Sequence, residues 1–386
     1  MRVLLAFDKF KDSLTAPQAC AAAAAALRER HPDWSLDECP LADGGEGFAP
    51  ILTRAAGGVS LMHEVAGPRG QRVAAGFGLV PWQQIPPAAQ TLLNLPLDRR
   101  EPANIAVIEM AAASGLALLP DDQRDPWQTT SQGTGELIAE AARRGVAAIV
   151  LGVGGSATND LGLGALSALG LEFADESGAP LTPPVPAHWS RIQRLTSGVP
   201  SALPPIFIAC DVTNPLLGPQ GATAVYGPQK GLQPADLARL EHESARLGLM
   251  LCTHCGKPDA LMAAPGAGAA GGIAFGLMTA AGARLLSGFD LVSAWLDLEH
   301  RITAADFVLT GEGRFDASSL AGKGPGAVAR RALALGKPVQ VFAGQIAVAA
   351  PAENLRLHAI TPPGLPLTEA LRAASGLLTA AIRQHC

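Results

Sequence analysis

The sequence predicts an α/β protein with two domains: an open domain with a parallel sheet built from both chain ends, residues 1–60 and 285–386, and a second α/β domain inserted between them, residues 61–284. Three observations predict it. Short apolar runs recur along the chain, and each leads through a glycine-rich polar turn towards a helical stretch. These runs are continuous rather than alternating, as in strands covered on both faces. At 386 residues the chain is also long enough for two or three domains.

The predicted strands of this parallel type are the continuous apolar runs 3–7, 147–153, 206–210, 307–311 and 338–344. The segment 63–80 differs, because it has the pattern of an antiparallel hairpin around Pro68, Arg69 and Gly70. The carboxyl ends of parallel strands are where open α/β sheets bind their ligands. The glycine-rich turns of this chain are therefore expected to gather there.

The predicted helices follow these strands. The first begins near Thr15, because Thr15 and Gln18 have capping-box spacing and Pro17 stands in the first turn, where its missing N–H costs little. Gly170 is expected to end the helix that follows residue 160. A further helix is predicted from about residue 325 to 336.

Composition and charge exclude several classes of protein. The formal net charge of -5 is small and scattered, so neither nucleic acid nor an anionic membrane is an expected partner. The uncharged stretch 260–283 is interrupted by Pro265 and glycines and is read as a turn followed by a buried helix. The N-terminus lacks the features of a signal peptide, and a cytoplasmic location is expected. Cys252 and Cys255 form a single CxxC pair, which is interpreted as reduced cysteines at the end of a helix in preference to a zinc site.

The segment from Phe307 to Arg330 suggests a phosphate-binding loop but is not a P-loop. Gly322 and Lys323 are followed by Gly324 instead of Ser or Thr. Lys323 nevertheless precedes a predicted helix N-terminus, which favours an anion. Upstream, Glu312, Arg314 and Asp316 make a functional loop a better interpretation than a plain turn.

Two turns near the N-terminus carry further charges. Lys9 and Lys11 follow the first predicted strand and could neutralise phosphate or carboxylate oxygens, although alone they could equally be a solvated turn. Asp43 and Glu46 flank a glycine pair, and their oxygens suit Mg²⁺.

The central turns are similar. Residues 152–160 place Ser156 and Asp160 between a strand and a helix, where Asp160 could also be a helix cap. Asp211 directly follows the strand 206–210, and Lys230 lies in a glycine-bounded loop. Each turn alone would be ordinary, but together they indicate a charged, ligand-binding site.

The chemistry these residues favour is phosphoryl transfer, which needs charge neutralisation and an acid to orient the nucleophile. The eight histidines lie outside all these turns, so no Ser-His-Asp arrangement is indicated. Residues 266–271 read GAGAAG, a formal dinucleotide fingerprint, but Pro265 and a helical pattern precede it where a strand is required. A tight turn opening a packed helix is the preferred interpretation. A nicotinamide-dependent oxidoreductase stays as an alternative, and so does a non-catalytic sugar-acid sensor.

The sequence resembles the bacterial glycerate kinase family of the first type. The resemblance runs essentially end to end and is carried by the blocks FDKFKDSLTA, PLADGGEGF, IEMAAASGL, TTSQGTGELI, GVGGSATND, ACDVTNPLLGPQGA, YGPQKG, GAGAAGG and LTGEGRFD with GKGP. It implies one Rossmann-like and one inserted α/β domain with the active site between them, and ATP-dependent phosphorylation of D-glycerate with Mg²⁺, at the 2-position. Two departures stand beside functional loops: the family often has Gly at the position of Asp12 and Gln-Thr at the positions of Ser318 and Ser319.

The residues then receive roles as hypotheses. The catalytic candidates are Asp211, Lys11 and Arg314, with Asp211 as the acid nearest the reacting hydroxyl because it follows a rigid strand. The substrate-binding candidates are Lys9, Asp43, Glu46, Asp160 and Asp316. The candidates for ATP or phosphate are Ser156, Lys230, Gly322, Lys323 and Gly324, and the metal candidates are Glu312 and Asp316. A kinase of the same fold acting on another small hydroxy acid is the nearest alternative, and a homo-oligomer is compatible with the sequence.

Overall fold

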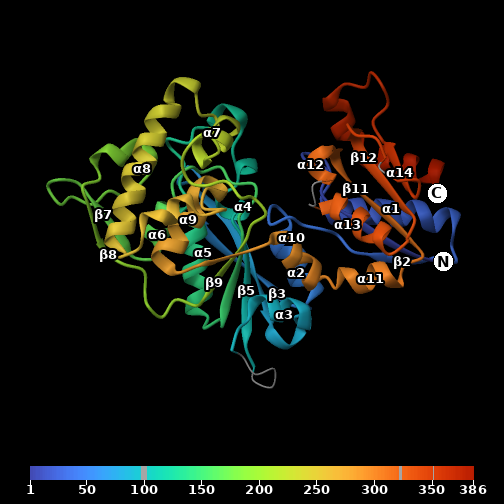
Figure 1. Ribbon diagram of the computed structural model, residues 1–386, viewed down its shortest axis with the longest axis horizontal. Coiled ribbons are helices and arrows are strands. Elements are labelled where there is room, and N and C mark those ends of the chain that lie inside the picture. Colours follow the sequence, from blue (N-terminus) through green and yellow to red (C-terminus); the bar gives the residue numbers. More distant parts are fainter. Residues whose placement is uncertain (97–101, 321–323, 351) are drawn as a thin grey trace. The chain divides into compact units, whose positions relative to one another are not determined.

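The computed structural model describes residues 1–96, 102–320, 324–350 and 352–386. The chain forms two compact units, one of Met1–Asp43 with Val292–Cys386 and one of Gly44–Leu291 (Figure 1). The predicted junctions were at residues 60–61 and 284–285, whereas these units meet at 43–44 and 291–292. Both units combine helices with parallel strands, so the predicted α/β fold class is confirmed.

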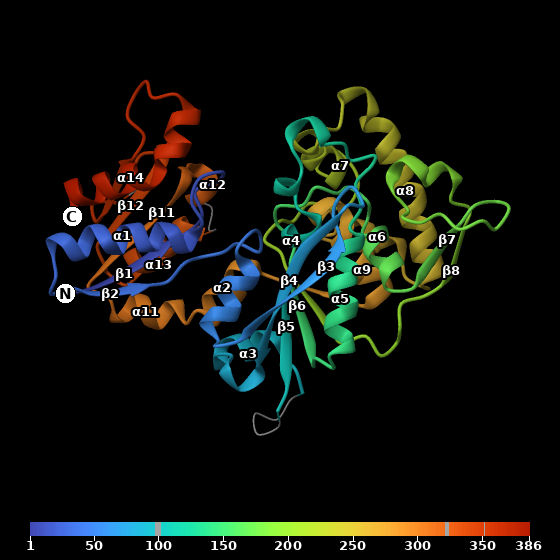
Figure 2. The same ribbon diagram turned by 180° about the vertical axis from the view of Figure 1, so that it is seen from behind.

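The first unit, which contains both chain ends, has a five-stranded sheet in the order β13-β12-β11-β1-β2. Its strands are all parallel, and they are β1 (Arg2–Phe7), β2 (Ser35–Glu38), β11 (Phe307–Phe315), β12 (Val339–Ile346) and β13 (Leu355–Ala359). Helices α1 (Ala16–Arg30) and α14 (Leu367–His385) pack together on one face, and α11 (Leu298–Ala304) and α13 (Gly324–Ala334) cover the other (Figures 1 and 2). The short helix α12 (Ala317–Leu320) follows β11.

The start of α1 shows how the local sequence sets an element. The Thr15 side chain accepts a hydrogen bond from the backbone N–H of Gln18 at 3.3 Å, and the Gln18 side chain accepts one from the backbone N–H of Thr15 at 2.9 Å. These bonds satisfy N–H groups that a helix start otherwise leaves unpaired. The predicted capping box is therefore confirmed.

The connections of this sheet create a switch point between β1 and β11. The chain leaves β1 towards β2 on one side, and it leaves β11 towards β12 on the other. Side chains that follow these two neighbouring strands therefore diverge around a crevice at their carboxyl ends, which is where open parallel sheets bind ligands.

The second unit has a six-stranded sheet in the order β10-β9-β6-β5-β4-β3. Its strands are β3 (Val59–Ala66), β4 (Arg72–Pro81), β5 (Asn104–Glu109), β6 (Ala148–Gly152), β9 (Ile206–Ala209) and β10 (Arg284–Leu286). Strands β5, β6, β9 and β10 are parallel to one another, and β3 and β4 form the predicted antiparallel hairpin. A separate hairpin consists of β7 (Leu171–Ala174) and β8 (Arg194–Ser197).

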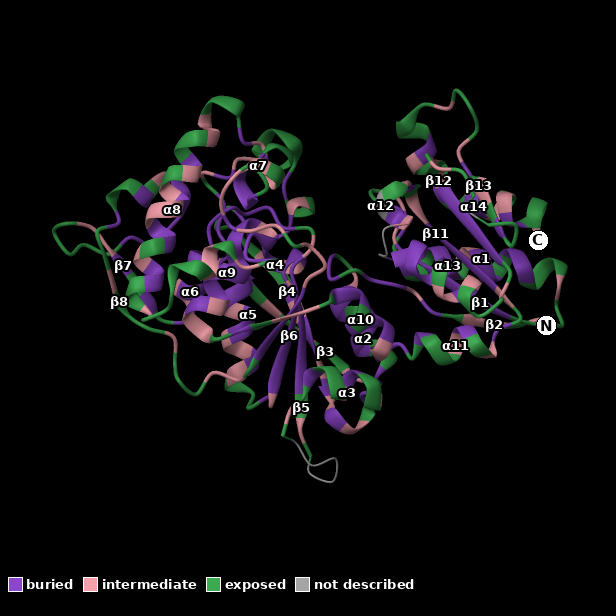
Figure 3. Ribbon diagram, viewed as in Figure 1, coloured by how far each residue is buried: buried purple, intermediate pink, exposed green. Residues whose placement is uncertain are grey.

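The longer helices of this unit are α5 (Gln132–Arg143), α8 (Leu237–His254) and α9 (Ala269–Ala281), and the shorter ones are α2 (Phe48–Ala55), α3 (Pro87–Leu93), α4 (Ala111–Ser114), α6 (Leu163–Ala168) and α7 (Ala222–Tyr226). Helix α10 (Gly288–Trp295) crosses the junction of the units. Strands β6 and β9 are buried along their whole length, as their continuous apolar sequences predict (Figure 3). Within the described residues, no helix combines the length and apolar character needed to span a membrane.

One strand differs from its prediction in a way that matters for the site. Strand β11 was expected to end at residue 311, but it continues to Phe315 because it stays paired with β12 as far as Ile346. Glu312 and Arg314 therefore lie on the end of a strand and not in a flexible turn. Their side chains are held by the backbone of the sheet.

His358 on β13 leads to a prediction about acid stability. Its ring stacks on Phe342 and on His385, with ring centroids 4.8 and 4.1 Å away. Within the described part of the chain, its buried Nε2 has no hydrogen-bond partner. Burial, with the positive charges of His385 and Arg356, lowers its pKa to about 4. Below the ordinary pKa of 6.5 the unfolded chain takes up a proton that the folded protein does not, so stability falls between pH 6.5 and 4.

We expect His358→Gln to reduce this acid sensitivity by about 1 kcal/mol, a modest amount because the ring is half-buried. Urea unfolding at pH 7 and pH 4.5 measures it. His300→Gln, at an exposed position of the same unit, is the control. An equal loss of stability on acidification in the wild type and His358→Gln would contradict the prediction.

Candidate active site

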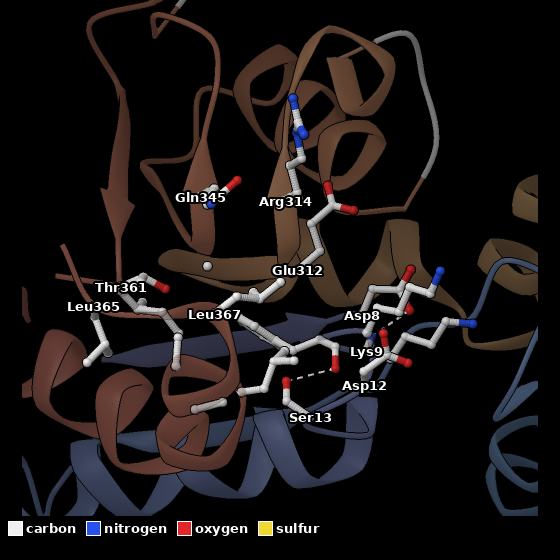
Figure 4. A pocket seen from close by; sticks show the side chains of 18 of the residues that line it. Asp8, Lys9, Asp12, Ser13, Glu312, Arg314, Gln345, Thr361, Leu365 and Leu367 are labelled. Atoms are coloured by element: carbon white, nitrogen blue, oxygen red, sulfur yellow. Dashed lines mark hydrogen bonds between the residues drawn. The ribbon is translucent and has the colours of Figure 1, made fainter. Parts of the chain in front are cut away.

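The carboxyl ends of β1 and β11 open into a cavity of about 450 Å³ within the first unit. Charged side chains from the loop after β1, from Asp43 and from the end of β11 line one part of it, and apolar side chains after β13 line the other (Figure 4). The lining includes the predicted site residues Lys9, Lys11, Asp43, Glu312 and Arg314. The structure therefore brings together residues from three distant sequence blocks.

Asp8, which the sequence analysis did not select, is the most deeply buried charged residue of this group. Asp8 is only 8% exposed. Its Oδ1 accepts a hydrogen bond from the N–H of Lys9 at 2.7 Å, and its backbone N–H donates to the carbonyl of Gly311 at 2.9 Å. Burial, reinforced by the nearby carboxylate of Asp43, raises the pKa of Asp8 to about 7. The sequence contained one signal for it: Asp8 directly follows the first apolar strand.

Glu312 lies on the adjacent strand. Burial raises its pKa to about 7, with smaller contributions from the carboxylates of Asp316 and Asp43, while a hydrogen bond from Ser319 opposes the shift. Its Oε1 is buried and has no hydrogen-bond partner among the residues that the structure describes. An unsatisfied carboxylate oxygen of this kind is costly, and it suggests a position for a cation or a donor group.

The positive charges around these acids come from both strands. Lys9 Nζ lies 3.9 Å from Asp43 Oδ1, and Arg314 Nε lies 3.3 Å from Asp316 Oδ2. The Arg314 side chain is 65% exposed, so it can move to a ligand at little cost. Lys11 lines the same cavity.

Asp12 explains one departure from the family pattern. Its φ is 61°, in the left-handed region that favours glycine. Asp is one of the few other residues that enter this region readily, because its short side chain can hydrogen-bond locally. Asp12 therefore preserves the turn that a glycine would make, and it adds a carboxylate to the cavity lining.

The fit of Mg²⁺ can be judged from these acids. Among the described residues, no group of three or more His, Cys, Asp or Glu side chains is arranged to hold a metal ion. Mg²⁺ usually takes only one or two protein carboxylates and completes its shell with substrate phosphates and water. The unpartnered Oε1 of Glu312 and the neighbouring charge of Asp316 fit that type of site.

A second cluster lies in the other unit, and it contains Ser156, Asp160 and Lys230. Lys230 is 1% exposed, and its Nζ donates to Ser156 Oγ at 2.9 Å and to the carbonyl of Thr158 at 2.6 Å. Burial lowers the pKa of Lys230 to about 7, and the charge of Asp160 opposes this shift. In this conformation the ammonium group holds the loop after β6.

Asp160 is fully buried and joins two helix starts. Its Oδ2 accepts hydrogen bonds from the N–H and the hydroxyl of Ser131, both at 2.7 Å, at the start of α5. At the start of α6, the N–H of Gly162 donates to Asp160 Oδ1 at 3.1 Å and the N–H of Gly164 donates to Oδ2 at 3.2 Å. Burial raises the pKa of Asp160 while these four hydrogen bonds oppose the rise.

Asp211 follows β9 as predicted and also makes hydrogen bonds that define local structure. Its carboxylate accepts hydrogen bonds from the Ser287 hydroxyl at 3.1 Å and from the N–H of Phe289 at 2.9 Å, at the start of α10. Glu46 is exposed and lies beside the loop after β6, near Gly155. Both residues belong to the second unit.

The glycine pair beside Glu46 permits close packing of two loops. The N–H of Gly154 donates to the carbonyl of Gly44 at 2.9 Å, and a Cβ on Gly154 would lie 2.7 Å from the Cα of Gly45. Larger residues would separate the 43–48 turn from the end of β6.

The predicted anion site at Gly322, Lys323 and Gly324 is only partly described, because Gly322 and Lys323 lie outside the described residues. Gly324 begins α13, and a Cβ placed on it would lie 3.3 Å from Asp8 Oδ2. This end of α13 therefore approaches the acid that follows β1.

The GAGAAG segment does not follow a strand. A 3₁₀ helix at Asp259–Ala263 precedes it, and α9 begins within it. A Cβ on Gly271 would lie 2.1 Å from the carbonyl oxygen of Thr158. The glycines thus permit a tight turn and close packing, as the preferred interpretation predicted, and the strand that a dinucleotide site requires does not precede them.

Comparison with known proteins agrees with this arrangement. The model of the glycerate kinase family matches residues 3–386. The glycerate kinase of Bacillus subtilis (strain 168) is 38% identical over 97% of this chain and 94% of its own length, and the glycerate 2-kinase of Escherichia coli (strain K12) is 38% identical over 90% and 86%. The crystal structure of putative glycerate kinase 2 from Salmonella typhimurium LT2 superposes with a TM-score of 0.76 at 38% identity, covering 100% of this chain and 96% of that one. The chain therefore belongs to the glycerate kinase family and is an enzyme, a phosphotransferase with an alcohol group as acceptor.

Proposed function

We propose that this enzyme transfers the γ-phosphoryl group of ATP to the 2-hydroxyl of D-glycerate, with Mg²⁺. The observation that carries the proposal is the meeting of four acids with three cationic side chains in one cavity at the switch point. The acids are Asp8, Asp12, Asp43 and Glu312, and the cations are Lys9, Lys11 and Arg314. The name of the Escherichia coli relative, glycerate 2-kinase, supports the 2-position.

The cationic side chains would serve two anions. D-Glycerate carries a carboxylate, and the transferred phosphoryl group carries negative charge throughout the reaction. Lys9, Lys11 and Arg314 are the groups we assign to this charge. Asp43, which lies near Lys9, would accept a hydrogen bond from a glycerate hydroxyl.

Asp8 is the acid that we assign to the reacting hydroxyl. The hydroxyl oxygen attacks the γ-phosphorus, the bond from that phosphorus to the β–γ bridging oxygen breaks, and ADP leaves, while the hydroxyl proton passes to Asp8. Asp8 is fixed at the end of β1 and is buried, as a positioned base should be. We prefer it to Asp211, whose carboxylate oxygens already bind Ser287 and Phe289.

Glu312 and Asp316 are the residues that would hold Mg²⁺, together with phosphate oxygens. The ion would neutralise phosphate charge and fix the orientation of the nucleotide. The assignments of Ser156, Lys230 and Gly322–Gly324 to phosphate, and of Glu46 and Asp160 to substrate, stay predictions. The burial of Lys230 and Asp160 favours a structural role for both.

The test is to incubate the enzyme with Mg²⁺ and ATP plus either glycerate enantiomer and to identify the product by phosphorus NMR. We expect 2-phosphoglycerate from D-glycerate, little product from L-glycerate, and no turnover when EDTA removes the metal. A 3-phosphoglycerate product would refute the assigned position, and turnover in EDTA would refute the metal.

A further inference from the structure

The cavity at the switch point is larger and more apolar than glycerate alone requires. Beyond its charged end, it is lined by aliphatic side chains of the loop after β13 and of α14, namely Ile360, Leu365, Leu367, Ala370, Leu371 and Ala374. Figure 4 shows Thr361 and Leu365 on one side of the cavity and Asp8, Lys9 and Asp12 on the other. A three-carbon acid with two hydroxyls and a carboxylate has little apolar surface to place against this wall.

Leu367 is the clearest sign that this wall receives a ligand. Leu367 is 68% exposed, although it is an apolar residue at the first position of the long helix α14. Exposed leucines are unremarkable singly, but this one lines a cavity with five other aliphatic side chains. A flat apolar group bound against this wall would remove these side chains from water, which is favourable.

Polar groups at the wall restrict the type of ligand. Gln345 at the end of β12 and Thr361 after β13 also line the cavity. A Gln amide donates and accepts hydrogen bonds at adjacent atoms, which matches the edge of an adenine ring. A cavity of about 450 Å³ is within the usual range for a small-molecule site.

We propose that this apolar wall binds the adenine base of the nucleotide, with the phosphates extending towards Lys9, Lys11 and Arg314. The wall consists of Ile360, Leu365, Leu367, Ala370, Leu371 and Ala374. The inference rests on the proposed function, because it takes ATP as the co-substrate. It places the base, and the three cationic side chains assigned to the phosphates, in the unit that contains both chain ends. It also gives the β13–α14 loop a role in the choice of nucleotide.

The test compares ATP with inorganic triphosphate, which has the same phosphate chain but no base. Binding of each is measured by calorimetry with the wild type, Leu367→Asp and Leu367→Met. The wild type should bind ATP more tightly than triphosphate. Leu367→Asp should lower the affinity for ATP by at least about 10-fold and change the affinity for triphosphate by less than about 3-fold, because only the base contacts the wall.

Two variants guard against trivial effects. Leu367→Met keeps an apolar side chain and should retain ATP affinity within about twofold. Leu335→Asp changes a leucine that is 40% exposed in the same unit but does not line the cavity, and it should leave both affinities unchanged. Circular dichroism checks that each variant is folded.

The outcomes separate this inference from the proposed function. If the enzyme phosphorylates D-glycerate but Leu367→Asp binds ATP as the wild type does, the base site is wrong and the function stands. If Leu367→Asp selectively weakens ATP but no glycerate enantiomer is phosphorylated, the base site stands and the acceptor is wrong. Equal loss of ATP and triphosphate would also overturn the base site, since it would indicate a general disturbance of the cavity.

Discussion

Asp8→Asn should reduce kcat for D-glycerate phosphorylation by about 10²–10⁴-fold, the usual contribution of a positioned acid or base. The amide keeps the size of the side chain, and its oxygen can still accept the hydrogen bond from the N–H of Lys9. It cannot accept the proton of the attacking hydroxyl. We therefore expect an intact fold and little change in the affinity for ATP, with the loss confined to turnover.

The measurement is ADP release in a coupled assay, with ATP affinity from calorimetry and folding from circular dichroism. Asp33→Asn, an exposed position in the same unit, should keep the wild-type rate. The same substitution at Asp211 discriminates between the two candidates: if Asp211→Asn loses turnover and Asp8→Asn does not, the acid-base role returns to Asp211. If kcat falls for Asp8→Asn and the circular dichroism spectrum shows an unfolded protein, Asp8 is instead required for the stability of the fold.

Local sequence was sufficient for much of the fold because the relevant signals act over a few residues. The capping box of Thr15 and Gln18 sets the start of α1, and Gly170 follows α6 with a φ of 105°. The extension of β11 to Phe315 was not predictable in this way, because it depends on pairing with Ile346, which is 31 residues away in the chain. The apolar run in the sequence ends at Gly311, but the backbone pairing of β11 with β12 continues to Phe315.

The candidate site shows a similar division. The gathering of Lys9, Lys11, Asp43, Glu312 and Arg314 follows from parallel strands whose carboxyl ends share one edge. Asp8 was passed over because burial cannot be seen in a sequence, although burial is the property that shifts its pKa. The same limit applies to Lys230, which looks like a loop lysine in sequence and is enclosed by Ser156 and Thr158 in the structure.

Asp160→Asn should destabilise the second unit by about 3–5 kcal/mol, the usual cost of removing one partner from a buried ionic network. The carboxylate accepts four hydrogen bonds, two from Ser131 and one each from Gly162 and Gly164. The Asn side chain has a donating NH₂ group in place of one of the two acceptor oxygens of Asp160. The backbone N–H groups at the starts of α5 and α6 that bind this oxygen would then lose their acceptor and face another donor. The charge of Asp160 that favours the protonated form of buried Lys230 would also be lost.

Urea unfolding followed by circular dichroism measures the effect, and a midpoint lowered by about 1–2 M is expected. Asp122→Asn, at an exposed position of the same unit, should change stability by less than about 0.5 kcal/mol. The Ser131 hydroxyl also accepts a hydrogen bond from the N–H of Ala165, so it links α5 to α6 together with Asp160. Ser131→Ala and Asp160→Asn should therefore be strongly non-additive, because each removes part of the same linkage. An unchanged urea midpoint for Asp160→Asn, combined with a raised KM for glycerate, would restore Asp160 to substrate binding, since only a residue that touches glycerate would separate those two measurements.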